Sequence, residues 1–477
     1  MFGNLFNFSD PSKNSYYFPF IIIIIIILLL IQIIKDYFFK KVQNLIDSFD
    51  IELPPNESYD FSIVTRKESL RIRYLIAYVI TRCAMWAKAP YLYYLFMIVH
   101  KFSFVEIGFL FLIREIGGLF FGTIIYKLAL KSRRKLLCHI FNFITIINVL
   151  LLIQGSRILA YLAIIISSGF GAGFISSTFE AWLLTESEMI FHNYPNVKQR
   201  FLKRTLKKSY IYDAINSIIT CFICSFIYTK FGIIAPFWIN IFLSLISSIV
   251  IEYLWDENIR LGLEDAQDYI RLYRAMHLIK KLDVLCIGLI EGLVKACFFI
   301  YVFSWTPILK LSTYGPINVG FIFTIMLSAM MIGLNFYEIF FIYLRFDYHI
   351  SIIAFLFLLG LVLFLIYYIN SFLLRLIFLS ICNGLFGFYN PLIYLIKSEM
   401  FSERYRATIN FLFSIPTNVY IIIIFLHLNY MNCFTLYLIS SIICLIAFII
   451  GIILNIFIKI TNNNEENNDH EGYNYIL

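Results

Sequence analysis

Long apolar stretches separated by short polar segments recur along the whole chain. Most of them run for about 18 to 25 residues, the length that an α-helix needs to cross the hydrocarbon core of a bilayer. The pattern therefore predicts an all-α membrane protein with many spanning helices. The predicted spans are residues 16–34, 74–99, 105–130, 136–153, 157–184, 208–228, 235–254, 283–305, 317–341, 349–368, 372–396, 407–428 and 434–459.

The order of the spans predicts two bundles of six helices, with one extra helix in front of them. A charged stretch between the sixth and seventh core spans separates the two bundles. Transporters built from two repeated halves have this organisation. The predicted parts are 1–71 (extra transmembrane helix and cytoplasmic connector), 72–255 (first bundle), 256–282 (central cytoplasmic loop), 283–459 (second bundle) and 460–477 (disordered cytoplasmic tail).

The distribution of positive charge predicts the orientation. If the central loop is cytoplasmic, twenty-eight of the 38 Lys and Arg residues fall in cytoplasmic segments and six in segments on the other side. Cytoplasmic loops carry such an excess, so we expect the C-terminus in the cytoplasm. The first span has its lysines after the apolar run, not before it, so it is expected to be a retained helix and not a cleaved signal.

Composition excludes several classes of protein. The chain is 61% hydrophobic and only 14% charged, too few charged residues to cover a soluble domain of this size. The net charge of +8 resides in loops between spans, so a nucleic-acid partner is not expected. Most of the nine cysteines fall within apolar spans, which argues against a disulfide framework. No zinc, nucleophile-elbow or acyltransferase motif occurs, so neither an enzyme nor a bound metal or cofactor is expected.

Several short motifs occur in one order along the chain. They are residues 86–93 (WAKAPYLY), 177–182 (STFEAW), 235–237 (APF), 255–258 (WDEN), 303–307 (FSWTP), 320–323 (GFIF) and 406–408 (RAT). Together they resemble the molybdate-anion transporters of the major facilitator superfamily. The resemblance implies the major facilitator fold, an extra N-terminal helix, and transport of a small oxyanion, in the first place molybdate, by alternating access.

Four features depart from the family pattern. Met85 stands where the family has an aspartate, Lys295 where it has an acidic residue, and Ser414 where it has an arginine. The loop at 130–135 (LKSRRK) keeps only the terminal basic pair of the superfamily motif. The altered positions include charges that would face a solute. Another small polar or organic solute therefore remains an alternative substrate.

Four cations within the spans are candidates for binding the substrate. Arg82 and Lys88 lie on one face of the first core span, with Met85 between them, and are too deep to reach the membrane surface easily. An arginine fork and a lysine ammonium suit an oxyanion. The alternative is that one of them pairs with a carboxylate of another helix. Arg114, in the second span, and Lys295, in the seventh, are the other two candidates.

Four further residues are candidates for coupling or gating. Glu180 is a possible proton-binding acid, or else the partner of a cation in the first core span. Asp213 lies near a span end and suits a gate. Glu291 precedes Lys295 by four residues, the favourable order for an intrahelical ion pair. Asn383 lies among glycines in a tenth span that is predicted to break easily.

Besides a transporter of another solute, two other classes of protein are alternatives to an oxyanion transporter. They are a non-transporting scaffold or sensor, and a membrane-embedded enzyme for which no motif is found. The expected partners are a small anionic solute, the lipid bilayer and, as a further candidate, a coupling proton. The plasma membrane is favoured over an internal membrane.

Overall fold

The fold was analysed in a computed structural model. It describes residues 61–131, 133–168, 172–192, 194–258, 281–313, 317–344, 346–400 and 403–473, together with residue 277. The predicted extra span 16–34 and most of the central loop lie outside the described residues. The described residues contain helices, turns and irregular connections but no strand, as expected for an all-α membrane protein.

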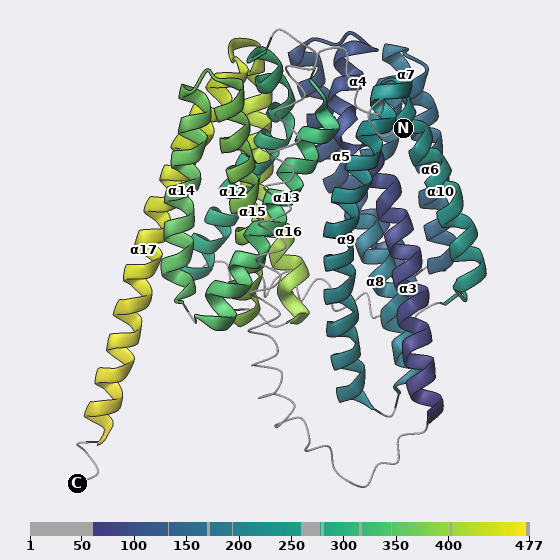
Figure 1. Cartoon of the computed structure of the whole chain (residues 1–477). Coiled ribbons are helices and arrows are strands. Elements are labelled where there is room, and N and C mark those ends of the chain that lie inside the picture. Colours follow the sequence, from purple (N-terminus) through teal and green to yellow (C-terminus); the bar gives the residue numbers. More distant parts are fainter. Residues whose placement is uncertain are drawn as a thin grey trace. The chain divides into compact units, whose positions relative to one another are not determined.

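The described chain falls into two compact units (Figure 1). The first ends at Leu263 and also takes in Ile317–Ser328, at the beginning of α13. Its helices are α3 (Phe61–Lys88), η2 (Ala89–Tyr91), α4 (Leu92–Ile98), α5 (Phe104–Lys131), α6 (Arg134–Ile153), α7 (Arg157–Ser168), α8 (Ala172–Ile190), α9 (Pro195–Phe231) and α10 (Ala235–Leu254).

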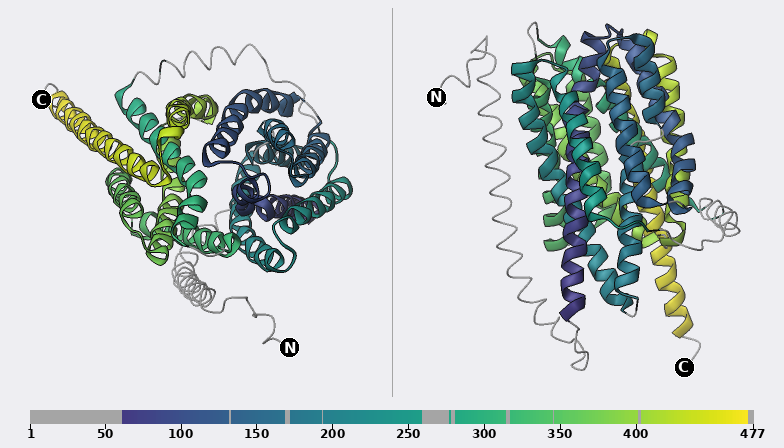
Figure 2. Two further views of the ribbon diagram at one scale, coloured as in Figure 1. Left: turned by 90° about the horizontal axis from the view of Figure 1, so that it is seen from above. Right: turned by 90° about the vertical axis from the view of Figure 1, so that its right-hand side faces the viewer.

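The second unit comprises the remaining part of the chain from Glu264 onwards. The end-on view in Figure 2 shows its long helices side by side. The helices of this unit are α12 (Leu282–Leu311), α13 (Val319–Glu338) from Ala329 onwards, η3 (Ile339–Tyr343), α14 (Tyr348–Tyr368), α15 (Phe372–Met400), α16 (Glu403–Leu426), η4 (Leu428–Tyr430) and α17 (Cys433–Tyr473).

The helices of the two units pack in the same order. In the first unit, α3 contacts α10, α9 and α8, while α6 contacts α10, α7 and α8. In the second, α12 contacts α17, α16 and α15, while α14 contacts α17 and α15. Each unit therefore repeats one arrangement, in which the first helix packs on the last and the third helix packs on the last and the fourth.

Two arginines at equivalent places reinforce this repeat. Arg157 begins α7 and donates to the carbonyl of His100, just after α4, and its guanidinium lies over the Phe102 ring. Arg375 lies in the first turn of α15, donates to the carbonyl of Ile366 and lies over the Phe434 ring. Arg375 is only 1% exposed because its guanidinium donates to backbone carbonyls at the end of α14.

Eight helices of the described chain are long and apolar enough to cross a membrane. The other predicted core spans coincide with α3–α4, α5, α7–α8 and α16. Charged residues and an interruption explain why α3–α4 does not qualify as one apolar helix. It carries Arg82 and Lys88, and Pro90 lies in the 3-10 turn that separates α3 from α4.

Three helices run beyond the apolar spans from which they were predicted. α3 begins at Phe61 and α9 at Pro195, well before the predicted span starts, and their extensions pack together. There Arg71 donates to the Thr205 hydroxyl at 3.4 Å and lies over the Phe201 ring. α17 continues to Tyr473, through much of the segment for which the sequence predicts a disordered tail. Helical hydrogen bonds are local, so an established helix can continue into polar sequence.

The segment after α10 closes one end of the first unit. Trp255 stacks on Trp182 of α8 at 3.9 Å between ring centroids, and its indole donates to the carbonyl of Arg73. The Glu257 carboxylate accepts from the backbone N–H groups of Lys135 and Leu136, in the first turn of α6. Two of the family-like motifs, 177–182 and 255–258, therefore meet in one structural cluster that fixes α3, α6 and α8.

Candidate functional site

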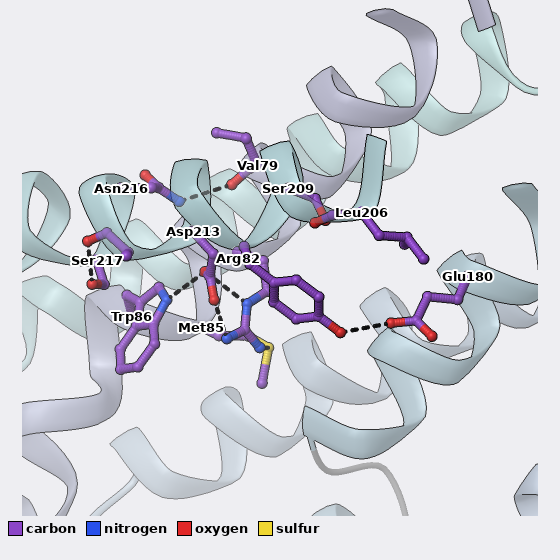
Figure 3. Close-up of polar contacts among 12 residues, drawn as sticks. Val79, Arg82, Met85, Trp86, Glu180, Leu206, Ser209, Asp213, Asn216 and Ser217 are labelled. Carbon is purple, nitrogen blue, oxygen red and sulfur yellow. Dashed lines mark hydrogen bonds and ion pairs between the residues drawn. The ribbon is translucent and has the colours of Figure 1, made fainter. Parts of the chain in front are cut away.

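The main polar contact inside the first unit joins α3 to α9 (Figure 3). The Asp213 carboxylate accepts from Arg82 Nε at 2.8 Å and from the second guanidinium nitrogen at 2.5 Å. Trp86 Nε1 donates to the same carboxylate at 2.8 Å. The Arg82 and Asp213 side chains are only 13% and 12% exposed. A bidentate arginine–carboxylate pair is strong and directional, so Asp213 fixes the orientation of Arg82.

Further polar contacts follow the same helix pair towards Thr220. Asn216 donates to the backbone carbonyl of Val79, and its side-chain oxygen accepts from the Cys83 thiol and the Thr220 hydroxyl. Asp213, Asn216 and Thr220 of α9 therefore contact polar groups of α3 rather than facing an open space. Cys83 acts here as a weak donor in a helix contact.

Glu180 lies near this site but does not pair with a described cation. Its carboxylate accepts from the Tyr210 hydroxyl of α9 at 3.1 Å (Figure 3). The cation partner that the sequence suggested for Glu180 is therefore not Arg82, which is bound by Asp213 instead.

Lys88 and Arg114 are two further cations of the first unit. The charge of Arg114, on α5, acts on the Lys88 ammonium at the end of α3. Neither side chain forms an ion pair with a carboxylate of the described residues. The neighbouring Glu115 points in a different direction from Arg114, because adjacent helical residues diverge by about 100°.

The second unit holds a buried cluster around Glu291 of α12. Glu291 Oε1 accepts from Lys295 Nζ at 2.6 Å, so the predicted intrahelical pair is present. It also accepts from Lys397 Nζ of α15 at 2.8 Å. Lys397 Nζ donates in addition to Asn410 Oδ1 of α16 at 2.8 Å. Glu291 is 1% exposed and Lys397 7%, whereas the Lys295 side chain is 45% exposed.

Asn383 lies in a region of close helix packing. It is 5% exposed on α15, which continues without interruption through Pro391. The predicted easily broken helix is therefore regular here. Gly333 of α13 and Gly384 of α15 approach so closely that a Cβ on Gly333 would overlap the Gly384 carbonyl. Small residues allow this backbone contact, which positions α13 against α15 within the second unit.

Sequence reasoning missed three of these relations. The charge distribution places Lys397 among the cytoplasmic charges, no motif points to Asn410, and the position of Asp213 near a span end suggests a gate. Their partners lie 106, 13 and 131 residues away, so no local spacing signals them. The described residues also contain no group of three or more His, Cys, Asp or Glu side chains that could hold a metal ion.

Comparisons with known proteins agree with this fold. A curated relative from Xenopus laevis, named molybdate-anion transporter, is 24% identical over 261 residues. That match covers 54% of this chain and 55% of the frog protein, so the chain spans about half the length of this relative. The family-model match runs over residues 57–388, most of the chain.

Solved structures show the same fold at low identity. The nucleoside transporter NupG is 15% identical with a TM-score of 0.62, over 81% of this chain and 98% of that one. An autoinhibited POT-family peptide transporter is 10% identical with a TM-score of 0.64, over 82% and 96% of the two chains. By its family-model match, the chain belongs to the major facilitator family MFS_5, described as sugar transporters with 12 transmembrane helices.

Proposed function

We propose that this major facilitator transporter moves a small oxyanion, with molybdate as the first candidate, by alternating access. The observation that carries the proposal is that two cations of the first unit, Lys88 and Arg114, have no carboxylate ion pair within the described chain. Unpaired charges within a membrane are costly unless a wet cavity or an ionic ligand compensates them. An anion that binds both side chains would supply that compensation.

The helix positions place both cations at similar depth. Lys88 precedes Ile98, the end of α4, by ten residues, and Arg114 follows Phe104, the beginning of α5, by ten. The connection between α4 and α5 is short, so both ends lie at the same membrane face. At about 1.5 Å per residue, each cation is therefore roughly 15 Å from that face. This depth suits a substrate site near the middle of the bilayer.

The name of the curated relative supports an oxyanion, since that protein is called a molybdate-anion transporter. The description of the family supports a second candidate, a sugar or another polar organic solute. Two aromatic rings, Trp86 and Phe323, lie 6.3 Å apart in the first unit and could contact such a solute. Uptake of labelled molybdate, sulfate and sugars by the reconstituted protein distinguishes the two candidates.

We also propose the plasma membrane as the location of the protein, which imaging of the tagged chain would test.

Substitution of Lys88 by glutamine is expected to raise the apparent KM for the oxyanion by about ten-fold or more. A charge-assisted hydrogen bond contributes about 1.5–3 kcal/mol, and about 1.4 kcal/mol corresponds to a factor of ten. Arg114→Gln should act in the same direction. The measurement is concentration-dependent uptake in proteoliposomes, with Lys230→Gln, at the exposed end of α9, as the matched control. Unchanged KM values in both variants would place the substrate site elsewhere.

We further propose a proton as the coupling ion and Glu180 as the group that binds it. Its carboxylate is half-buried and is held by the Tyr210 hydroxyl alone, without a described lysine or arginine. A carboxylate without a cation partner can gain and lose a proton without breaking an ion pair. Asp213 and Glu291 hold cations and are proposed to gate or to position these cations instead.

A Glu180→Gln variant should lose accumulation driven by a pH gradient and keep exchange of labelled for unlabelled oxyanion. One pH unit corresponds to about 1.4 kcal/mol, so one coupled proton supports about ten-fold accumulation per unit of gradient. The two modes are measured in the same proteoliposomes, with and without the gradient. Tyr210→Phe is the control that removes the hydrogen bond but keeps the acid. Proton-driven accumulation that survives in Glu180→Gln would exclude this role.

A further inference from the structure

Two lysines of the described chain bind one carboxylate, that of Glu291. Both lysines bind the same oxygen, Oε1, at 2.6 Å for Lys295 and 2.8 Å for Lys397. The other oxygen, Oε2, is buried and has no hydrogen-bond partner in the described chain. Among the described residues, Glu291 thus has two cationic partners on one oxygen and none on the other.

The two lysines differ in how firmly they are held. Lys397 is 7% exposed and donates both to Glu291 and to Asn410 of α16. Lys295 is 45% exposed, and Glu291 is its only ion-pair partner among the described residues. Lys397 is therefore fixed by two helices. Lys295 has an exposed ammonium-bearing side chain and a single contact that it can exchange for another.

A buried carboxylate left without a cation is strongly unfavourable, whereas one that keeps a partner is not. Glu291 is 1% exposed, so a single lysine would be trapped on it. The second lysine removes that constraint. When Lys295 leaves, Lys397 still compensates Glu291, and Asn410 still orients Lys397.

We propose that Lys295 is a releasable anion-binding group of the second unit, and that Lys397 and Asn410 are positioning residues that make its release possible. The ligand is a small oxyanion, which would exchange with Glu291 for the Lys295 ammonium. This inference rests on the proposed function, because it assigns to the transported oxyanion a contact beyond Lys88 and Arg114.

The decisive variant is Lys397→Gln, which leaves Lys295 as the sole cation on Glu291. The KM for oxyanion uptake is expected to rise by about ten-fold, as in Lys295→Gln, because a charge-assisted contact is lost in both. The double variant Glu291→Gln/Lys397→Gln frees Lys295 again and should restore KM to near the wild-type value. A purely structural role for the ion pair predicts no such recovery. Lys281→Gln, exposed just before α12, is the control.

Each variant is compared with Lys88→Gln in the same proteoliposomes, and KM is read separately from the maximal rate. If Lys88→Gln raises KM and Lys397→Gln does not, the release of Lys295 is refuted while the oxyanion function stands. If Lys397→Gln raises KM but the double variant does not recover, Lys397 itself would be the contact and the proposal falls. If the wild-type protein transports no oxyanion, the proposed function is refuted, and the role of Lys295 that depends on it is refuted as well.

Discussion

Replacing Trp255 with alanine is expected to lower the melting temperature of the purified protein by about 10 °C. Large-to-small substitutions of buried tryptophans cost about 3–5 kcal/mol, and each kcal/mol lowers Tm by roughly 2–4 °C in a unit of this size. Trp255 is 2% exposed, stacks on Trp182, and contacts Phe179 edge to face at 4.8 Å. Its loss removes the packing between α10, α8 and α3 together.

The helix that precedes Trp255 offers a matched control. Trp238 of α10 is 54% exposed, so Trp238→Ala removes an equal side chain from the surface of the unit. Its melting temperature should stay near that of the wild type in detergent. Trp255→Phe should lie between the two, since it keeps a ring for Trp182 but not the hydrogen bond to the Arg73 carbonyl. Equal losses in Trp255→Ala and Trp238→Ala would contradict the clustering of the two family-like motifs.

The sequence predicted the helices well because membrane spans depend on a local property. A run of apolar residues long enough to cross the bilayer is visible without tertiary information, and the predicted span 235–254 coincides with α10. The extensions of α3 and α9 were missed for the same reason. They are polar, and they are helical where they pack on one another through contacts such as that of Arg71 with Thr205.

Ion pairs between neighbouring residues of one helix can be predicted from the sequence, whereas ion pairs between helices cannot. The Glu291–Lys295 pair follows from a spacing of four residues and is present. The pairing of Arg82 with Asp213 depends on how α3 and α9 are rotated about their axes, which no periodicity reports. The motif 255–258 resembles the family, but the sequence does not reveal its structural role. In the structure Glu257 caps the beginning of α6, which lies 122 residues earlier.

The second large effect is expected at Asp213, whose replacement by asparagine leaves Arg82 as an uncompensated charge inside the first unit. Breaking a buried ion pair by removing one partner costs about 3–5 kcal/mol, and the Arg82 side chain is only 13% exposed. Met85, whose sulfur lies 3.9 Å from the guanidinium, and the Trp86 ring are weak substitutes for a carboxylate. Thermal unfolding of Asp213→Asn should therefore begin well below that of the wild type.

The double variant Arg82→Gln/Asp213→Asn removes both charges and keeps hydrogen-bonding groups of similar size. It should be more stable than Asp213→Asn alone, because no buried charge remains. Lys230→Gln on α9 serves as the surface control. If the effects of the two substitutions simply add, the pair in Figure 3 is not coupled. Uptake by the stable double variant then decides the role of Arg82. Transport that persists with an unchanged KM makes Arg82 a structural partner of Asp213, whereas a stable but inactive double variant makes it a group that the anion contacts.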